Sequence, residues 1–268
     1  MICFPNAKIN IGLNITSRRS DGYHNVETVF YPVKINDALE IIEAPQMGFE
    51  TSGIAIPGLA QDNLCIKAYN LLRQDFNLPN IHIHLHKIIP IGAGLGGGSA
   101  DAAFFIKLVN DKFELGLTDE AMQSYCQLLG ADCAFFIQNK PLFACGKGDV
   151  FKPIALDLSD YMIVLVMPPV HVSTAEAYRG VQPKFPHQNL QPLIKLPINQ
   201  WQGKIVNDFE PHIFKAHPQI REVKTKLIEA GAIFALMSGS GASVFGIFDS
   251  TPDVSFFKQM GCIVFDNL

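Results

Sequence analysis

Alternating apolar and polar residues mark two strands in the first third of the chain. The stretch "IHIHLH" at residues 81–86 alternates strictly, which places Ile81, Ile83 and Leu85 on one face, and residues 8–15 alternate in part. A period of two is typical of strands with one buried face. We therefore expect half-buried strands over 8–15 and 81–86.

Capping residues and periodicity predict one helix between these strands and two after them. Each expected helix starts at a residue whose side chain can accept a hydrogen bond from the first turn, and the last of them stops at a glycine. The expected spans are 62–76 from Asp62, 99–109 from Ser99, and 118–130 from Thr118 to Gly130.

The second half of the chain alternates short strands with helices. A new buried strand is expected at 160–169, and the Pro-, Gln- and Asn-rich stretch 180–205 is expected to form a loop or a loose helical insertion. The remaining elements are a helix over 218–230, a strand over 233–237, a turn at 238–241, a strand over 243–248, a helix over 252–260 and a strand over 262–265. This order predicts an α+β protein with helices on one side of a mostly antiparallel sheet. We place a domain boundary near residue 155, giving domains 1–155 and 156–268.

Composition narrows the class of partner. Of 268 residues 48% are hydrophobic, and the net charge is −4, so there is no electrostatic footprint for nucleic acid or an anionic membrane. The longest apolar run, 162–167, is too short to span a bilayer, and the N-terminus lacks the features of a signal peptide. Six scattered cysteines form no C-x-x-C pair. We therefore expect a cytoplasmic protein with reduced, mostly buried thiols.

A glycine-rich run is the strongest chemical signal. Five of the seven residues from Gly92 to Gly98 are glycine, and Ser99 follows. Without Cβ atoms, consecutive N–H groups can point into one concavity and bind an anion, and a helix N-terminus adds further donors. The run therefore predicts a phosphate-binding loop, with a tightly packed glycine loop as the alternative.

Two other interpretations of this region are weaker. No lysine precedes Ser99, so the run is not a Walker loop, and although it contains G-x-G-x-x-G, the preceding alternating strand and Pro90 do not suit a dinucleotide-binding fold. The histidines at 82, 84 and 86 share a strand face and could bind a metal, but no acidic or cysteine partner is evident. We therefore interpret them as polar side chains on a half-exposed strand face.

Three blocks of sequence resemble the GHMP kinases. "PIGAGLGGGSADAA" (90–103) is similar to the second motif of that family, "NAKINIGL" (6–13) to the first, and "MSGSGASVFGIF" (237–248) to the third, in the family's order. The resemblance implies two domains, an N-terminal ribosomal-protein-S5-like domain and a C-terminal ferredoxin-like α/β sandwich. It also implies ATP as co-substrate and Mg²⁺ as its companion, with no metal ligand assigned. The ATP loop would comprise Pro90, Ile91, Gly92, Ala93, Gly94, Leu95, Gly96, Gly97, Gly98, Ser99 and Ala100.

The block at 6–30, with its "DGYH" stretch, resembles one branch of this family. Enzymes of that branch phosphorylate a hydroxyl of a cytidine-diphosphate-linked sugar alcohol in the non-mevalonate route to isoprenoid precursors. "GADCAFF" (130–136), "ACGKGD" (144–149), "VSTAEAY" (172–178) and "NDFE" (207–210) also have counterparts there. The alternatives are another small-molecule kinase of the family, of homoserine or mevalonate type, a dinucleotide-dependent oxidoreductase, and a silent binding protein with the kinase fold. The silent binding protein has no support, because the lysine and the aspartate that the resemblance implies for catalysis, Lys8 and Asp132, are both present.

The resemblance assigns Asp132 and Lys8 as the catalytic pair. Asp132 would accept the hydroxyl proton, although the residues alone favour a capping role in a loop. Lys8 lies in an apolar strand, where an unpaired charge is costly, so a pair with Asp132 would satisfy both. Cys133 and Ala134 replace the Val-Pro that the branch usually carries after this aspartate, which would leave the loop less rigid.

The other site residues are expected to bind the acceptor. Tyr23 and Tyr178 would enclose a flat base whose polar edge His24 reads, while Asn10 and Lys147 would contact the rest of the substrate. The turn of the third motif would approach the phosphates or the catalytic pair through Gly239, Ser240 and Gly241. No macromolecular partner is expected, and the protein is predicted to be a monomer or a weak homodimer.

Overall fold

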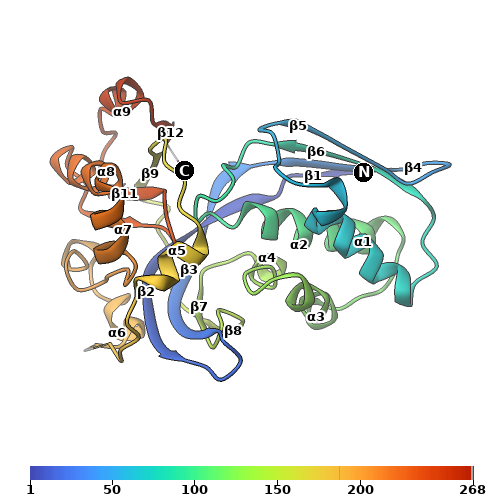
Figure 1. The fold of residues 1–268 in the computed structure, drawn as a ribbon, viewed down its shortest axis with the longest axis horizontal. Coiled ribbons are helices and arrows are strands. Elements are labelled where there is room, and N and C mark those ends of the chain that lie inside the picture. The colour runs from blue at the N-terminus through green and yellow to red at the C-terminus, as the bar shows by residue number, and fades with distance from the viewer. Residues whose placement is uncertain (187, 267) are drawn as a thin grey trace. The chain divides into compact units, whose positions relative to one another are not determined.

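The computed structural model describes residues 1–186, 188–266 and 268, and it combines helices with mostly antiparallel sheets, as predicted (Figure 1). The chain forms two compact units, neither of them continuous in sequence. Unit 1 comprises Met1–Lys8, Pro32–Ile91 and Gly96–Lys140; unit 2 comprises Ile9–Tyr31, Gly92–Leu95 and Pro141–Leu268. The boundary near residue 155 remains a prediction.

Unit 1 contains a four-stranded sheet in the order β1-β4-β6-β5. The strands are β1 (Ile2–Cys3), β4 (Ala38–Glu43), β5 (Gly48–Gly53) and β6 (Ile81–Lys87). The strand β6 pairs antiparallel with β4 and parallel with β5. The side chains of Ile81, Ile83 and Leu85 are buried and the histidines between them are not, so the predicted strand and its buried face are confirmed.

Helices cover one face of this sheet (Figure 1). They are α1 (Leu64–Asp75), α2 (Gly97–Lys112), α3 (Asp119–Leu129) and α4 (Phe135–Gln138), with a short 3₁₀ turn at Ala60–Asp62. The helix α3 has the predicted caps, Thr118 and Gly130. For α1 the predicted cap was wrong: Asp62 lies in the 3₁₀ turn, and the side chain of Asn63 accepts a hydrogen bond from the backbone of Cys65.

A second sheet runs in the order β2-β3-β7-β8. Its strands are β2 (Asn6–Arg18), β3 (His24–Asn36), β7 (Leu142–Cys145) and β8 (Val150–Pro153). The expected strand over 8–15 is the centre of β2, which is longer at both ends. Both β2 and β3 run from one unit into the other along the chain.

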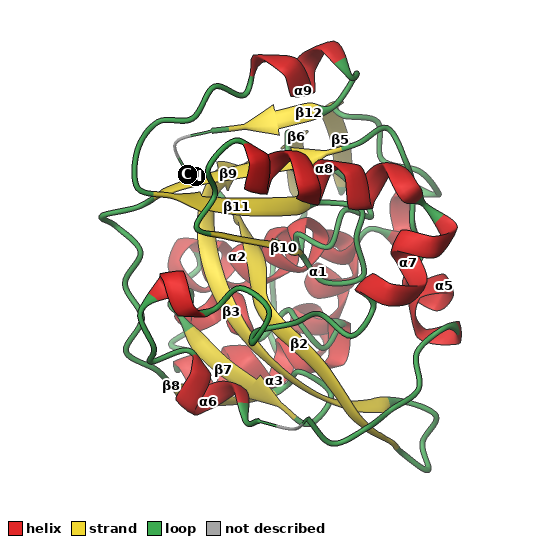
Figure 2. Cartoon of the chain, turned by 90° about the vertical axis from the view of Figure 1, so that its left-hand side faces the viewer, coloured by secondary structure: helices red, strands yellow, loops and turns green. Residues whose placement is uncertain are grey.

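The third sheet, in unit 2, has the order β10-β11-β9-β12 and is antiparallel throughout. Its strands are β9 (Met162–Met167), β10 (Phe234–Met237), β11 (Val244–Phe248) and β12 (Ile263–Phe265). The helix α8 (Pro218–Glu229) packs on β10 and β11, as Figure 2 shows. The helix expected over 252–260 is shorter, α9 (Ser255–Gln259), and the side chain of Asp253 accepts a hydrogen bond from the backbone N–H of Ser255 where it begins.

The stretch 180–205 is irregular with short helical segments, in agreement with the expected loose helical insertion. It contains α6 (Leu190–Leu193) and a 3₁₀ turn at Ile198–Gln200, and Trp201 is buried against Phe234. The neighbouring helices are α5 (Thr174–Arg179) and α7 (Glu210–Ala216). His187, within this stretch, lies outside the described residues. Among the helices that the structure describes, none has both the length and the apolar character to cross a membrane.

Candidate active site

A buried lysine and a half-exposed aspartate form an ion pair in unit 1. The Nζ atom of Lys8, on β2, lies 3.3 Å from Oδ2 of Asp132. The lysine side chain is 4% exposed, whereas that of the aspartate is 36% exposed. A buried ammonium is stable only when it is paired, so this contact explains why a lysine is tolerated in the apolar strand. The exposed side of the carboxylate remains accessible to a hydroxyl group.

The turn between α3 and α4 holds Asp132 in place. The helix α3 ends at Gly130, and the next two residues lead directly into the buried side chains of Cys133 and Phe135. The thiol of Cys133 has a hydrogen bond with the side chain of Ser99, and burial raises its pKa to about 11. The cysteine that replaces the usual valine is therefore a neutral packing residue beside the aspartate.

The glycine run starts helix α2 earlier than predicted. The helix begins at Gly97, after a left-handed Gly96, so Ser99 lies in its first turn and does not cap it. A Cβ on Gly94 (φ +75°) would lie 2.1 Å from the carbonyl oxygen of Ser238, and one on Gly96 (φ +71°) would lie 3.0 Å from Cε of Lys8. These two glycines are thus required by close protein packing as well as by backbone conformation.

Gly98 differs from the other glycines of the run because a side chain on it would meet no close atom. It is exposed, and the nearest atom to a Cβ built on it is 3.9 Å away, on Leu64. The side chains of Ala93, Leu95 and Ala100 are buried, so the loop presents mainly backbone. The first N–H groups of α2, a helix of 16 residues, have no acceptor within the helix and can bind an anion.

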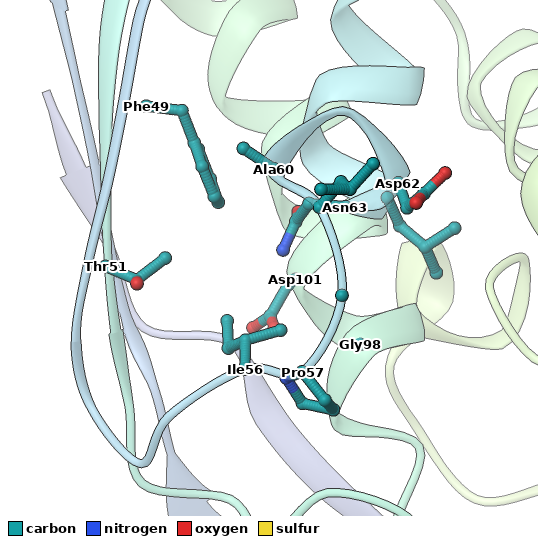
Figure 3. Close-up of a pocket in the computed structure, with 12 residues that line it drawn as sticks. Phe49, Thr51, Ile56, Pro57, Ala60, Asp62, Asn63, Gly98 and Asp101 are labelled. Atoms are coloured by element: carbon teal, nitrogen blue, oxygen red, sulfur yellow. The ribbon is translucent and has the colours of Figure 1, made fainter.

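A pocket of about 370 Å³ lies in unit 1 beside the start of α2, and Gly98 forms part of its wall (Figure 3). Apolar side chains of Phe49, Ile56 and Leu59 line it together with the polar Asn63. This combination of flat apolar walls and a few polar groups is typical of small-molecule sites. Gly98 was predicted from the sequence as part of the ATP loop, whereas the side chains that line the pocket were not; the signal available for them was the N-cap position of Asn63.

A buried cluster of three charges includes Asp101, which lines this pocket. Lys87, on β6, is salt-bridged to Asp37 and, at 2.8 Å, to Asp101 of α2, and all three side chains are at most 4% exposed. Asp37 also accepts hydrogen bonds from the backbone of Ile88 and Ile89. Burial favours the neutral amine, but the two carboxylates outweigh it and raise the pKa of Lys87. Burial is also the main reason that the pKa of Asp101 rises to about 7; Lys87 opposes it and the charge of Asp37 adds to it.

In unit 2, Asn10 connects the third motif to the glycine loop. Its side-chain amide donates to Thr28 and its backbone N–H to the hydroxyl of Ser238, which in turn donates to the carbonyl of Gly94. The buried Gly239 packs against Gly94, and Gly241 is likewise buried. The structure therefore brings Asn10 and the turn at 238–241 together with Gly94. Ser240 is half-buried, with its hydroxyl 3.5 Å from that of Thr174.

The predicted aromatic residues also gather in unit 2. The rings of His24 and Tyr178 stack with centroids 4.8 Å apart, and Tyr178 also meets Phe209 edge-on. The ammonium of Lys147 lies 5.3 Å from the ring centroid of Tyr23, which is 61% exposed. Burial, helped by the charge of Arg18, lowers the pKa of His24 and keeps its imidazole neutral. This cluster offers exposed aromatic surface and a neutral imidazole to a ligand.

The histidines of β6 do not assemble a metal site. The side chains of His84 and His86 both bind the hydroxyl of Ser52, and that of His82 packs over Gly48. In the described part of the chain, no three His, Cys, Asp or Glu side chains are placed to hold a metal ion.

Comparisons with known proteins agree with this arrangement. The families described as GHMP kinases N terminal domain and GHMP kinases C terminal match residues 63–140 and 188–267. A relative in Bacteroides fragilis strain YCH46, named 4-diphosphocytidyl-2-C-methyl-D-erythritol kinase, is 54% identical over 252 residues, which is 92% of each chain. A solved structure of 4-(cytidine 5'-diphospho)-2C-methyl-D-erythritol kinase is 29% identical, covers 99% of this chain and 98% of its own, and has a TM-score of 0.84. A homoserine kinase from Cytophaga hutchinsonii shares the fold, with a TM-score of 0.67 over 98% of this chain and 94% of its own, at 16% identity.

Proposed function

Since this chain belongs to the GHMP kinase family, we propose that it transfers the γ-phosphoryl group of ATP to the 2-hydroxyl of 4-diphosphocytidyl-2-C-methyl-D-erythritol. The products are the 2-phosphate and ADP. The relative named for this reaction is 54% identical over nearly the whole chain, whereas the homoserine kinase shares only the fold. A kinase of homoserine or mevalonate type is therefore not favoured. Nor is a dinucleotide-dependent oxidoreductase, because β6, which precedes the glycine run, has an antiparallel neighbour.

The observation that carries the proposal is the buried ion pair of Lys8 and Asp132. Phosphoryl transfer asks a protein mainly to position the reactants and to stabilise charge. The oxygen of the substrate hydroxyl forms a bond to the γ-phosphorus, the bond from that phosphorus to the β–γ bridging oxygen breaks, and ADP leaves with the electron pair. Asp132 accepts the hydroxyl proton, and the ammonium of Lys8 holds the carboxylate ionised and stabilises negative charge beside it.

The nucleotide is assigned to the pocket beside α2. Its apolar walls, Phe49, Ile56 and Leu59, suit a flat purine, and Gly98 leaves the first N–H groups of the helix open to phosphate oxygens. Mg²⁺ would neutralise charge on the triphosphate. The described residues include no dedicated carboxylate set for it, which fits an ion held largely by substrate phosphates and water.

The alcohol substrate is assigned to the aromatic cluster of unit 2. Stacking on Tyr23 or Tyr178 suits the cytosine base, and the neutral imidazole of His24 can exchange hydrogen bonds with its polar edge. The ammonium of Lys147 suits the diphosphate, and the amide of Asn10 suits a hydroxyl of the methylerythritol unit.

The proposed reaction is a step of the non-mevalonate route to isoprenoid precursors. A cytoplasmic location is part of the proposal, and it is supported by six cysteines that are all free, since disulfides are rare in the cytosol. The monomer or weak homodimer remains a prediction.

The test is transfer of γ-labelled phosphate from ATP to 4-diphosphocytidyl-2-C-methyl-D-erythritol by the wild type, by Asp132→Asn and by Asp160→Asn. The last removes an exposed carboxylate and is the matched control. We expect full transfer by the wild type and the control, and a kcat lower by roughly 10³ for Asp132→Asn, within the usual contribution of a general base. Absence of transfer by the folded wild type would overturn the proposal.

A further inference from the structure

Asp101 has one carboxylate oxygen with no protein partner. The residue is 3% exposed, and Oδ2 is bound to Lys87 at 2.8 Å, whereas Oδ1 is buried and has no hydrogen bond to any residue the structure describes. A buried, unsatisfied carboxylate oxygen is costly, so a native structure retains one where a ligand or another group can satisfy it.

This oxygen belongs to the pocket beside α2. Asp101 is one of its lining residues, and Figure 3 shows its carboxylate projecting from α2 into the same space as the side chain of Asn63, across from Thr51 and Phe49. The amide oxygen of Asn63 is engaged by the backbone N–H of Cys65, so its amide nitrogen is the group turned to the pocket. The pocket therefore offers one acceptor and one donor between apolar walls.

The charge cluster fixes Asp101 in this orientation. Two carboxylates share the single ammonium of Lys87, and Asp37 is further held by two backbone N–H groups. With both carboxylates ionised, the cluster carries one more negative than positive charge, and of its three residues Asp101 lines the pocket. A neutral hydrogen-bond donor on a ligand satisfies such an oxygen, while the nearby ammonium disfavours a cation.

We propose that Asp101 determines which nucleoside the kinase accepts: its Oδ1 atom accepts a hydrogen bond from a donor group of the bound nucleoside, and Lys87 and Asp37 are positioning residues that aim it. The inference rests on the proposed function, because it takes the occupant of this pocket to be the phosphoryl donor. The donor group is either the exocyclic amine of the base or a ribose hydroxyl.

Asp101→Asn replaces the hydrogen-bond acceptor that faces the pocket with a donor. The amide oxygen of the new side chain must face Lys87, which can only donate, so the amide NH₂ faces the pocket. A nucleoside donor then meets a donor, and ATP loses its hydrogen bond. A nucleotide with an acceptor in the same place gains one.

The test is a binding series measured by calorimetry without the alcohol substrate. The ligands are ATP, purine riboside triphosphate (which lacks the amine), inosine triphosphate (which has a carbonyl there), and 2'-deoxy- and 3'-deoxy-ATP. The proteins are the wild type, Asp101→Asn, and Asp111→Asn, a control that removes an exposed carboxylate from the same helix.

We expect the wild type and the control to lose about tenfold in affinity, about 1.4 kcal/mol, for the analogue that lacks the donor group. Asp101→Asn should bind ATP about tenfold more weakly and should no longer distinguish ATP from that analogue. If the wild type binds purine riboside triphosphate more weakly than ATP, the donor group is the exocyclic amine. Asp101→Asn should then bind inosine triphosphate more tightly than ATP. If the wild type binds 2'-deoxy- or 3'-deoxy-ATP more weakly than ATP, the donor group is the ribose hydroxyl that this analogue lacks.

Equal affinity of the wild type for all five nucleotides would overturn the inference, as would unchanged discrimination in Asp101→Asn. The wild-type series decides the matter by itself if Asp101→Asn does not fold. Transfer from ATP with no discrimination would overturn this inference alone, whereas absence of both ATP binding and transfer would overturn the proposed function.

Discussion

Replacing Lys87 by methionine tests the buried charge cluster in unit 1. The substitution keeps an unbranched side chain of similar length but leaves Asp37 and Asp101, both at most 3% exposed, without their shared cation. Breaking a buried pair by removing one partner costs about 3–5 kcal/mol. Because whole domains are stabilised by only about 5–15 kcal/mol, this loss is a large fraction of the total. For a chain of this size it corresponds to roughly 10 °C in Tm.

The loss should depend on pH in a defined direction. Without the ammonium, the two buried carboxylates retain a proton in the folded state at a pH where the unfolded chain has released it. The folded state then binds more protons than the unfolded state, so stability falls as pH rises. Urea unfolding of the wild type and of Lys87→Met at pH 5 and pH 8 should show the larger deficit at pH 8.

The matched variant is Lys87→Met combined with Asp37→Asn and Asp101→Asn, which leaves a neutral cluster. It should recover most of the stability at pH 8. A deficit below about 1 kcal/mol for Lys87→Met, the range of a surface pair, would refute this account of the cluster. An equal loss in the free energy of unfolding of Lys87→Met at pH 5 and pH 8 would also refute it.

Three further outcomes are expected. Gly94→Ala should lose more than about 2 kcal/mol in urea unfolding, because its Cβ would lie 2.1 Å from a backbone oxygen at a left-handed position; a fully stable variant would contradict the packing. Gly98→Ala should keep or gain stability, because alanine favours the helix and fits at this position. The same variant should raise KM for ATP several-fold, because its methyl group narrows the pocket. An unchanged KM for ATP would place the nucleotide elsewhere. Burial raises the pKa of Asp101 to about 7, so ATP should bind more tightly as pH rises from 6 to 8, and Asp101→Asn should abolish that trend; a trend that persists in the variant belongs to another group.

Local sequence signals were sufficient where one residue decides an element. Thr118 and Gly130 fixed both ends of α3, and alternation fixed β6. The strands β3, β4 and β5 were not predicted, because their pairing partners lie elsewhere in the chain and the burial patterns of β3 and β5 do not alternate along their length. Such strands form because they pair with the rest of the sheet, and not because of a local sequence signal.

The same contrast applies to the candidate site. An unpaired lysine in an apolar strand indicated that Lys8 needs a partner, and the structure places Asp132 there. The same argument applies to Lys87, which follows the buried face of β6, but its partners Asp37 and Asp101 lie 50 and 14 residues away in sequence. The pocket walls were missed for a similar reason: Phe49 and Ile56 become a site only when the fold brings them to the start of α2.

The most direct test of the central claim is the product formed from ATP and 4-diphosphocytidyl-2-C-methyl-D-erythritol, followed by ³¹P NMR. We expect the wild type to form ADP and one new phosphomonoester in equal amounts, with the phosphate on the 2-hydroxyl, and Asp132→Asn to form neither at a comparable rate. ADP with inorganic phosphate alone, a phosphate on another hydroxyl, or full activity of Asp132→Asn would contradict it.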